Sequence, residues 1–447
     1  MPPSDHFRYD EVVVDPGRST ISCHYTTGGH TFMERFTFPM GGEWDAPAVR
    51  AAVRVLFLLA GVSYYKTTAA PLIDLGDHPT TRAERAFLTN FYVYGLGEFA
   101  HRNGIDLRGT TVTGPDATAA PPAPYEPDPG RPLIPFGGGI DSIVTVESLR
   151  DDHPDAALCI VHPPGDRFAA IEGAADVTGL PVVRIEREID PLVRRSDALG
   201  FLNGHVPVTA VITAAATVAA VLGGRDAVVL SNEWSASVPT LVEDGHPVNH
   251  QWSKGEDFER GYGELVRASL GPELSVFSYL RTRSELWVAQ RFARLARYHC
   301  AFRSCNRAFH QDPAQRLDHW CGRCDKCCFI DLVLAPYMAR TDLDAVFGGA
   351  EPLENPANEA MFRALVGLGS EPRPFECVGD RDECGAAALL AASRDDRAGS
   401  VVLRRLAGEL AGTGVDAEAV AAGLLEPRGT HHIPDRYAPA DLLARAR

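Results

Sequence analysis

The chain of 447 residues carries a formal net charge of −16 at pH 7, with hydrophobic and charged fractions of 45% and 23%. These fractions are those of an ordinary globular protein, and the length predicts two or three domains with substantial buried cores. The acidic balance argues against nucleic acid as a partner, because non-specific binding to a polyanion needs a basic surface. The N-terminus shows no basic segment followed by an apolar run, so we expect a cytoplasmic location rather than secretion.

The first 110 residues predict an α+β domain. Residues 7–40 alternate apolar and polar side chains in short runs separated by turn signals, which is typical of antiparallel strands. Residues 46–66 and 81–104 then show helical spacing. The following stretch, residues 111–131, is rich in proline and alanine and is expected to be a linker.

Residues 132–345 predict a second domain in which strands alternate with helices. The expected strands are residues 133–136, 156–162, 180–188 and 226–233, and the expected helices between them are residues 141–151, 167–179 and 206–222. Such alternation predicts an α/β fold with an open parallel sheet and helices on both faces. Residues 206–222 are expected to be a buried helix and not a membrane span, because the apolar run is short for a span. Residues 346–447 predict a mostly helical C-terminal region.

Residues 136–142 read FGGGIDS and join a predicted strand to a predicted helix. Three consecutive glycines cost backbone entropy that a tight conformation or a close ligand normally justifies. A turn of this kind gathers backbone N–H groups and a helix N-terminus at one point, which suits a phosphate. The stretch is neither a Walker A sequence nor a GxGxxG fingerprint. The alternative is a tight turn in which Asp141 or Ser142 only caps the helix.

Six of the ten cysteines lie within residues 300–328. The motif WCGRCDKCC supplies three thiols at close spacing and a fourth lies upstream; the expected Zn²⁺ ligands are Cys305, Cys321, Cys324 and Cys327. A closed four-cysteine site has no open coordination position, so we expect a structural zinc loop inserted in the second domain. The alternatives are reduced cysteines without metal and an iron–sulfur cluster. Cys300 and Cys328 are spare thiols that leave the ligand choice open.

Polar side chains follow two of the predicted strands. Glu233 ends the expected strand at residues 226–233, His250 and Lys254 lie in the segment after it, and Arg281 and Arg283 follow the next strand. Open parallel sheets bind ligands at the carboxyl ends of their strands. Arginine and lysine in that position suit phosphates and carboxylates, so we expect a binding role, although each charge alone is typical of a solvated surface.

The sequence GGGIDS resembles the pyrophosphate loop of the N-type ATP pyrophosphatases, which split ATP into AMP and pyrophosphate. The resemblance implies a sheet of the adenine-nucleotide α-hydrolase-like type, in which Gly138, Gly139 and Ser142 hold the phosphates and Asp141 helps to position Mg²⁺. Gly137 stands where the usual loop has serine, so one hydroxyl contact is lost. The cysteine pattern beside this loop also resembles that of the deazaguanine nitrile synthases of the same group, where zinc is structural.

Further segments extend the resemblance over nearly the whole chain, namely LLAGVSYYK, GLGEFAHRNGIDLRG, PFGGGIDSIVTVE and HHIPDRYAPADLL. Together they are similar to the ATP-dependent epimerases of UDP-N-acetylmuramoyl-L-alanyl-L-glutamate in bacterial peptidoglycan synthesis. The resemblance implies ATP, Mg²⁺ and structural Zn²⁺ as cofactors, the UDP-muramoyl dipeptide as substrate, and functional coupling to the ligase that adds L-Glu. The implied reaction inverts the terminal L-Glu to D-Glu through adenylation of its carboxylate, exchange of the α-proton and hydrolysis.

The sequence leaves the base that removes the α-proton open. The residues expected in catalysis are Asp141, Glu233, His250 and Lys254, and those expected to bind cofactors are Gly137, Gly138, Gly139, Asp141, Ser142, Lys254, Arg281 and Arg283. Other candidate bases are His205, His319, Tyr64, Tyr65, Lys66, Glu98, His431 and His432. Two further classes compete with the epimerase: an ATP-pyrophosphatase ligase that makes amides or nitriles, and a zinc-stabilised binding module without catalysis.

Overall fold

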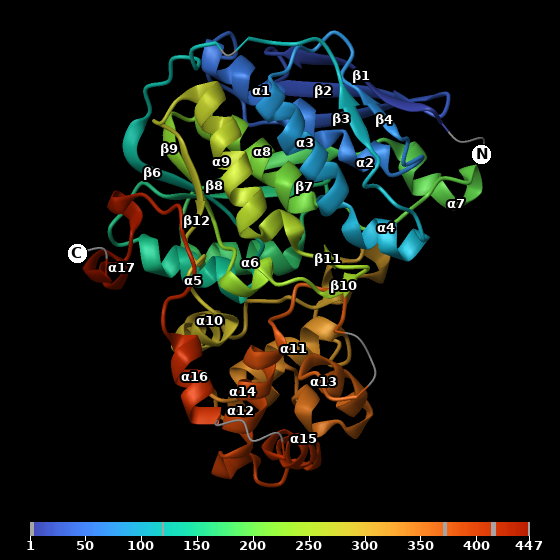
Figure 1. Cartoon of the computed structure of the whole chain (residues 1–447). Helices are drawn as coiled ribbons and strands as arrows, with labels where there is room; N and C mark the ends of the chain where they lie inside the picture. Colours follow the sequence, from blue (N-terminus) through green and yellow to red (C-terminus); the bar gives the residue numbers. More distant parts are fainter. Residues whose placement is uncertain (1–3, 119, 370–372, 413–416, 446–447) are drawn as a thin grey trace.

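The computed structural model describes residues 4–118, 120–369, 373–412 and 417–445. An upper part built on a large sheet stands over a smaller lower part made of helices (Figure 1). The strands of the sheet are β1 (His6–Asp15), β2 (Thr20–Thr27), β3 (His30–Thr37), β4 (Leu72–Asp74), β5 (Thr111–Thr113), β6 (Asp128–Pro135), β7 (Ala157–His162), β8 (Val182–Glu188), β9 (Arg225–Leu230) and β12 (Ser275–Ser278). The ten strands lie in the order β12-β9-β6-β7-β8-β3-β2-β1-β4-β5.

The half of the sheet formed by β12-β9-β6-β7-β8 is entirely parallel, which confirms the expected α/β fold. Consecutive residues point to opposite faces, since Leu133 belongs to the core on one side of the sheet and Ile134 to the core on the other. From β6 the chain adds β7 and β8 on one side, then returns to add β9 and β12 on the other. The strand order therefore reverses between β6 and β9, which is where open α/β sheets bind their ligands.

The N-terminal strands belong to the same sheet. β1, β2 and β3 form an antiparallel meander, and β4 and β5 continue it in parallel beyond β1. β3 pairs antiparallel with β8, with Phe36 opposite Arg187. Strands on both sides of the expected linker at residues 111–131 thus share one sheet, and β5 and the start of β6 lie inside that stretch. Pairing between strands so distant in sequence leaves no local signal in the chain.

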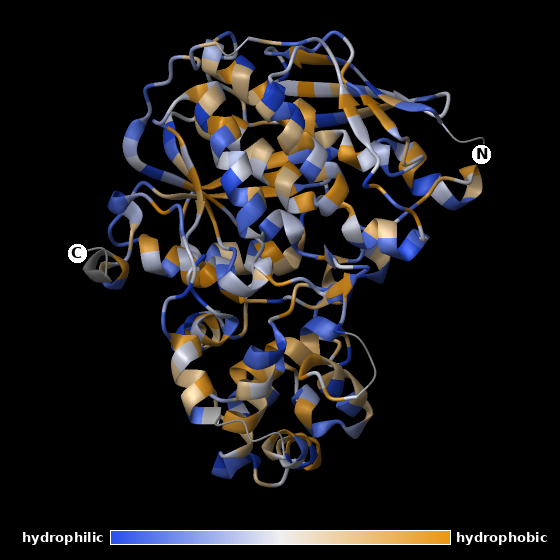
Figure 2. Cartoon of the chain, viewed as in Figure 1, coloured by the Kyte–Doolittle hydropathy of each residue, from blue (hydrophilic) through white to orange (hydrophobic). Residues whose placement is uncertain are grey.

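Helices cover both faces of the sheet (Figure 1). Those of the upper part are α1 (Pro47–Ala60), α2 (Val62–Tyr65), α3 (Arg82–Gly95), α4 (Gly97–Asn103), α5 (Ile140–Leu149), α6 (Ala169–Thr178), α7 (Ser196–Leu199), α8 (Val208–Leu222) and α9 (Glu256–Leu270). Figure 2 shows apolar residues concentrated on the strands and on the helices packed against them. α8 is buried as expected and packs against α1. By length and composition alone the stretch Pro47–Tyr65 could cross a membrane, but most of it is buried inside this fold.

The lower part continues the core on one face of the sheet. The helices that follow β12 are α10 (Glu285–Phe292), α11 (Asp325–Leu334), α12 (Arg340–Val346), α13 (Glu359–Leu365), α14 (Arg381–Ala392), α15 (Val401–Ala411), α16 (Ala417–Leu425) and α17 (Ala440–Arg445). One buried cluster runs from Ile134 and Phe277 in the sheet through Leu286 of α10 to Leu403 of α15. α17 returns to the side of the upper part (Figure 1). The lower part is therefore packed onto the sheet and does not have a core of its own.

Candidate active site

The glycine stretch forms the turn from β6 to α5. Gly138 has a φ of +73°, and a Cβ atom placed on it would lie 3.0 Å from the carbonyl oxygen of Ala170, so this position requires glycine. A Cβ atom on Gly139, the residue before α5, would lie 3.1 Å from Ser304 Oγ. A Cβ atom on Gly137 would meet open space, and no side chain caps the start of α5. The backbone of the turn is therefore tightly packed on one side and open at Gly137.

Three acidic side chains meet beside this turn. Asp141 follows β6, Glu233 follows β9 and Glu285 begins α10 after β12, so they extend from the carboxyl ends of three neighbouring strands. One carboxylate oxygen of each lies within 4.8 Å of the others. Asp141 Oδ1, Glu233 Oε1 and Glu285 Oε2 are buried and have no hydrogen-bond partner among the described residues. Unpartnered buried oxygens are costly, and a divalent cation, which prefers oxygen ligands, would satisfy them.

The pKa values of these carboxyl groups reflect their burial and mutual repulsion. Burial, followed by the charge of Glu233, raises the pKa of Asp141 to about 7, although Lys326 and Lys254 oppose the shift. Burial, followed by the charges of Asp141 and Glu233, raises the pKa of Glu285 well above its usual range. A cation among the three groups would favour their ionised forms. The donor set therefore fits Mg²⁺.

Arg281 fixes the two loops that carry Glu233 and Lys254. Its buried guanidinium pairs with Glu259 at 2.6 Å and donates to the carbonyl oxygens of Glu233 at 3.0 Å and Lys254 at 2.6 Å. Arg283 is also buried, and its guanidinium lies 2.5 Å from a carboxylate oxygen of α17. Both arginines were expected to bind phosphates, but both are engaged inside the protein. Their contacts favour a role in holding the loops that follow β9 and β12.

A second cluster of ionisable side chains surrounds Lys254. The Nζ atom of Lys254 lies 3.1 Å from the Sγ atom of Cys377. His250 hydrogen bonds through Nδ1 to a carboxylate oxygen of Glu98 at 2.5 Å, and a ring nitrogen of His250 lies within 4.8 Å of Cys377 Sγ. The ring of His205 lies against that of His250, with 4.1 Å between their centroids. The thiol of Cys377 therefore contacts an ammonium group and lies near an imidazole, with the carboxylate of Glu98 behind the imidazole.

The electrostatics of this second cluster favour a thiolate. Burial alone would raise the pKa of the Cys377 thiol, but Lys254 and His250 outweigh it and lower the pKa to about 7. Burial opposes protonation of His250, but its hydrogen bonds to Cys377 and Glu98 raise its pKa to about 9. Near neutral pH the pair is therefore suited to a thiolate beside an imidazolium.

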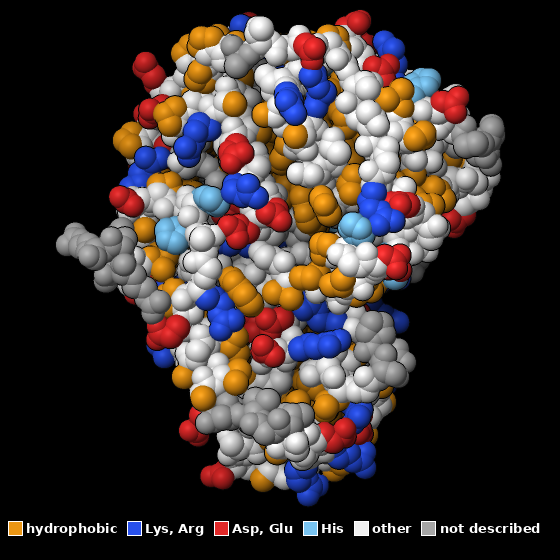
Figure 3. Space-filling view, viewed as in Figure 1, with side chains coloured by type: hydrophobic (Ala, Val, Ile, Leu, Met, Phe, Trp, Pro, Cys, Tyr) orange, Lys and Arg blue, Asp and Glu red, His pale blue; other side chains and the backbone are white. Residues whose placement is uncertain are grey.

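The two clusters form one site. Lys254 interacts electrostatically with both Cys377 and Asp141. The chain after Cys377 passes the carboxylates, because a Cβ atom on Gly379 would lie 3.3 Å from Glu285 Cγ. In Figure 1, α10 and α11 lie at the waist between the upper and lower parts, and Figure 3 shows charged side chains of both signs along this waist. The carboxylates, the lysine and the thiol thus line a boundary between two parts of the molecule.

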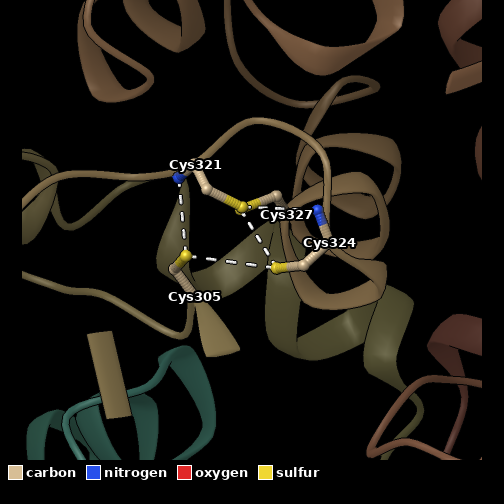
Figure 4. Close-up of side chains that lie close together, drawn as sticks. All are labelled: Cys305, Cys321, Cys324 and Cys327. Atoms are coloured by element: carbon tan, nitrogen blue, oxygen red, sulfur yellow. Dashed lines mark hydrogen bonds between the residues drawn. The ribbon is translucent and has the colours of Figure 1, made fainter. Parts of the chain in front are cut away.

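The four expected cysteines meet where the loop after α10 leads into α11 (Figure 4). The sulfur–sulfur distances are 3.7 Å for Cys321 and Cys327, 3.4 Å for Cys324 and Cys327, and 4.0 Å for Cys305 and Cys324. A tetrahedron with metal–sulfur bonds of about 2.3 Å has sulfur–sulfur edges of about 3.8 Å. The cluster therefore fits Zn²⁺. Cys300 is exposed and lies outside it.

Apart from Glu98 and His205, the additional candidate bases lie outside these clusters. Tyr64 and Tyr65 are buried among aromatic rings of the N-terminal half, and Lys66 donates to the side-chain oxygen of Asn203 at 2.7 Å. The exposed candidates are His319, His431 and His432. Of the additional candidates, only Glu98 and His205 lie near His250.

Sequence reasoning missed Glu285, Lys326 and Cys377. Glu285 follows the same strand as Arg281, so its place after a strand end was an available signal. Lys326 lies within the cysteine motif, which was interpreted only as a metal site. It donates to the backbone carbonyl of Cys377. Cys377 itself has no neighbours in sequence that mark a site, and only the fold brings it to Lys254.

A large cavity, about 990 Å³, lies between α1, α3 and α9. Trp252 and Asn249 line it, and they belong to the loop that also carries His250 and Lys254. Among the described residues that line it, neither the three carboxylates nor Cys377 is present. The cavity and the ionisable clusters therefore use different residues of this loop.

An open parallel sheet with acidic and cationic side chains gathered at the reversal of its strand order is the architecture of an α/β enzyme. The family model of the MurL N-terminal domain matches residues 2–279, and that of the MurL C-terminal domain matches residues 301–421. The chain belongs to the MurL family.

Three curated relatives are each named UDP-N-acetyl-alpha-D-muramoyl-L-alanyl-L-glutamate epimerase. The relative from Xanthomonas oryzae pv. oryzae is 38% identical over 89% of this chain and 86% of its own length. That from Salinispora tropica is 38% identical over 92% of this chain and 89% of its own length. That from a Micromonospora species is 38% identical over 98% of this chain and 97% of its own length. The family expected from the sequence is thereby confirmed.

Proposed function

We propose that this chain is an epimerase that inverts the terminal L-Glu of UDP-N-acetylmuramoyl-L-alanyl-L-glutamate to D-Glu, in the synthesis of peptidoglycan. Three relatives that are each 38% identical to it over most of both chains are named for this substrate and reaction. The protein is accordingly an isomerase.

We infer that the reaction uses ATP at the glycine turn, in a site of the pyrophosphate-loop type. One observation carries this inference: three buried carboxylate oxygens, which have no hydrogen-bond partner in the described part of the chain, lie beside a glycine turn that is open at Gly137. In this proposal the phosphates lie against Gly137, Gly138, Gly139 and Ser142, and Mg²⁺ is held by Asp141, Glu233 and Glu285. Bound Mg²⁺ would offset the negative charge of the phosphates.

The chemistry explains why ATP is needed. An ionised carboxylate makes its own α-proton very hard to remove, because the carbanion would stand beside a negative charge. Adenylation removes that charge and creates a carbonyl that can accept enolate charge. A base can then remove the α-proton, a proton can return to the opposite face, and water can release the free acid and AMP.

We assign complementary roles to the charged residues around the carboxylates. Lys254 and Lys326 are placed to balance negative charge from phosphates and from the developing enolate, because both already act on Asp141. Arg281 is a positioning residue that holds the loops of Glu233 and Lys254. His250 belongs to the proton-transfer machinery.

We propose that the four-cysteine cluster holds a structural Zn²⁺. Four thiolates complete a tetrahedral shell and leave no position for substrate. The cluster would fix the start of α11, which carries Lys326 into the site.

The substrate also suggests how the protein is used. A ligase that adds L-Glu to the UDP-muramoyl peptide must supply it, so we propose functional coupling to that ligase. We also propose a cytoplasmic location, which the nucleotide substrates of the proposed reaction support. No role in binding nucleic acid or membranes is proposed.

The test follows the atoms during turnover in D₂O with ATP, Mg²⁺ and the UDP-muramoyl dipeptide. We expect deuterium at the glutamate Cα, D-Glu in the product, and AMP with pyrophosphate. In H₂¹⁸O, ¹⁸O should enter the carboxylate of the glutamate that was adenylated. Inversion without AMP would contradict the role of ATP. AMP formed only with added ammonia, without inversion, would place the chain among the ligases.

A further inference from the structure

We propose that Cys377 exchanges the α-proton on one face of the bound glutamyl residue, with His250 as its proton relay and Glu98 as the positioning residue of His250. This inference rests on the proposed epimerase function and deepens it, because it assigns a base that the sequence left open.

The contacts of Cys377 are those of a reactive thiol. Lys254 Nζ lies 3.1 Å from its Sγ atom, and a ring nitrogen of His250 lies within 4.8 Å of it. Glu98 accepts a hydrogen bond from His250 Nδ1 at 2.5 Å, which fixes the orientation of the imidazole. Glu98 is in turn held by Arg102 at 2.6 Å. A carboxylate, an imidazole and a thiol in series are the arrangement that activates a thiolate.

Other buried cysteines of the chain have a different environment. Cys23, Cys159 and Cys384 are buried in the cores, where burial raises the pKa of each thiol. Cys377 is only partly buried, contacts the Lys254 ammonium group and lies near the His250 imidazole. A structural cysteine needs no such partners, so the setting of Cys377 indicates a chemical role.

Cys377 also lies beside the carboxylates proposed to receive the nucleotide. Glu233 and Glu285 are 2% and 4% exposed, and each has one oxygen that no described residue hydrogen bonds. Lys254 interacts with Glu233 as well as with Cys377, and Gly379 lies against Glu285. A carboxylate activated at the glycine turn would therefore bring its α-carbon toward the segment that carries Cys377.

The proposed step conserves atoms and charge. The thiolate of Cys377 takes the α-proton, so the C–H bond breaks, an S–H bond forms, and the electron pair moves into the acyl carbonyl as an enolate. A proton then returns to the opposite face from an exchangeable acid, either a side chain or a bound water. His250 gives the proton on its ring nitrogen nearest Cys377 to solvent, then takes the proton from the Cys377 thiol, which restores the thiolate and the imidazolium for the next turnover.

The experiment separates proton exchange from adenylation. Wild-type protein, Cys377→Ala and Cys377→Ser are each incubated with ATP, Mg²⁺ and the UDP-muramoyl dipeptide in D₂O. Deuterium at Cα is measured by mass spectrometry, together with D-Glu and AMP. We expect both Cys377 variants to lose about 10²–10⁴-fold in deuterium uptake and inversion, the usual contribution of a positioned acid or base, while AMP release stays within about tenfold of wild type. Cys300→Ser is the matched control, and it should behave like wild type.

Glu98→Gln tests the positioning role. It should reduce deuterium uptake less than the Cys377 variants do, and should leave AMP release near wild type. A merely structural Glu98 would lower both rates together.

Two results would overturn the proposal. Deuterium uptake retained in both Cys377 variants would remove the thiol from proton transfer, and a parallel loss of AMP would assign it to adenylation or folding. Should either variant fail to fold, iodoacetamide labelling of the wild-type protein decides, because bound dipeptide and ATP must protect Cys377 and not Cys300. A wild-type protein without inversion would contradict the epimerase function itself, which is a separate outcome.

Discussion

The four-cysteine cluster and the three-carboxylate cluster differ in how completely they surround a metal ion. The cysteines supply four sulfur atoms from residues 305–327, which is a full tetrahedral shell. The carboxylates supply three oxygen atoms from the ends of three strands, beside an open turn at Gly137 and two lysines. A full shell excludes substrate, whereas a partial shell leaves positions for phosphate and water. The first arrangement suits stability, and the second suits chemistry that needs a substrate at the metal.

The largest effect is expected from opening the full shell. Cys324→Ser should release the metal and lower the free energy of unfolding by about 5 kcal/mol or more, since structural zinc contributes roughly 10–16 kcal/mol in zinc-binding peptides. Elemental analysis should find about one zinc per wild-type chain and little in the variant, and thermal unfolding should show the lost stability. Cys300→Ser should change neither measurement. Equal zinc contents in Cys324→Ser and Cys300→Ser would contradict the assignment of a full metal shell to the four-cysteine cluster.

Arg281 tests how rigidly the partial shell is held. Arg281→Met leaves Glu259 buried without its partner, so the free energy of unfolding should fall by about 3–5 kcal/mol. AMP formation should also fall, because the loops of Glu233 and Lys254 lose the hydrogen bonds that Arg281 donates to both of them. Urea denaturation measures the first effect, and the double variant Arg281→Met with Glu259→Leu should recover much of it. Full AMP formation by Arg281→Met would show that the loops of Glu233 and Lys254 keep their positions without Arg281.

Asp141 separates chemistry from stability within the partial shell. Asp141→Asn should lower AMP formation by about 10²–10³-fold, the usual effect of removing one electrostatic contact to a transition state. The metal-free variant should be at least as stable as wild type, because one of three repelling carboxylates becomes neutral. Thermal unfolding without Mg²⁺ checks the second point, and the exposed Asp318→Asn is the control. A variant that loses both activity and stability would instead indicate a structural carboxylate.

The smallest losses of function and stability taken together are expected at the glycine turn. Gly138→Ala places a Cβ atom 3.0 Å from a carbonyl oxygen at a φ of +73°, so it should lower the free energy of unfolding by about 1–3 kcal/mol. Gly137→Ala meets open space and should leave the free energy of unfolding nearly unchanged. It should instead weaken ATP binding, measured by titration calorimetry. Equal stability losses in Gly138→Ala and Gly137→Ala would show that the turn is also tightly packed at Gly137.

Local patterns predicted those features whose residues are close in sequence. The spacing of Cys321, Cys324 and Cys327 indicated a metal site, and alternating strands and helices indicated the parallel sheet. The glycine turn was recognisable because its residues are contiguous. Glu285 and Cys377 come together with Asp141 only through the fold. Arg281 and Arg283 were expected to be available for a ligand. Their partners inside the protein, such as Glu259, could not be predicted from local sequence because tertiary packing sets them.

The pairing of β3 with β8 has a consequence for synthesis of the chain. Arg35 and Glu188, which face each other there, are 153 residues apart. At roughly 5–20 residues per second, a ribosome needs about 8–30 s to add β8 after β3 has emerged. During that interval β3 presents an unpaired edge that can accept a strand from another chain. Nascent chains that end before β8 should therefore aggregate, and slowing translation between the two strands should lower the yield of soluble protein.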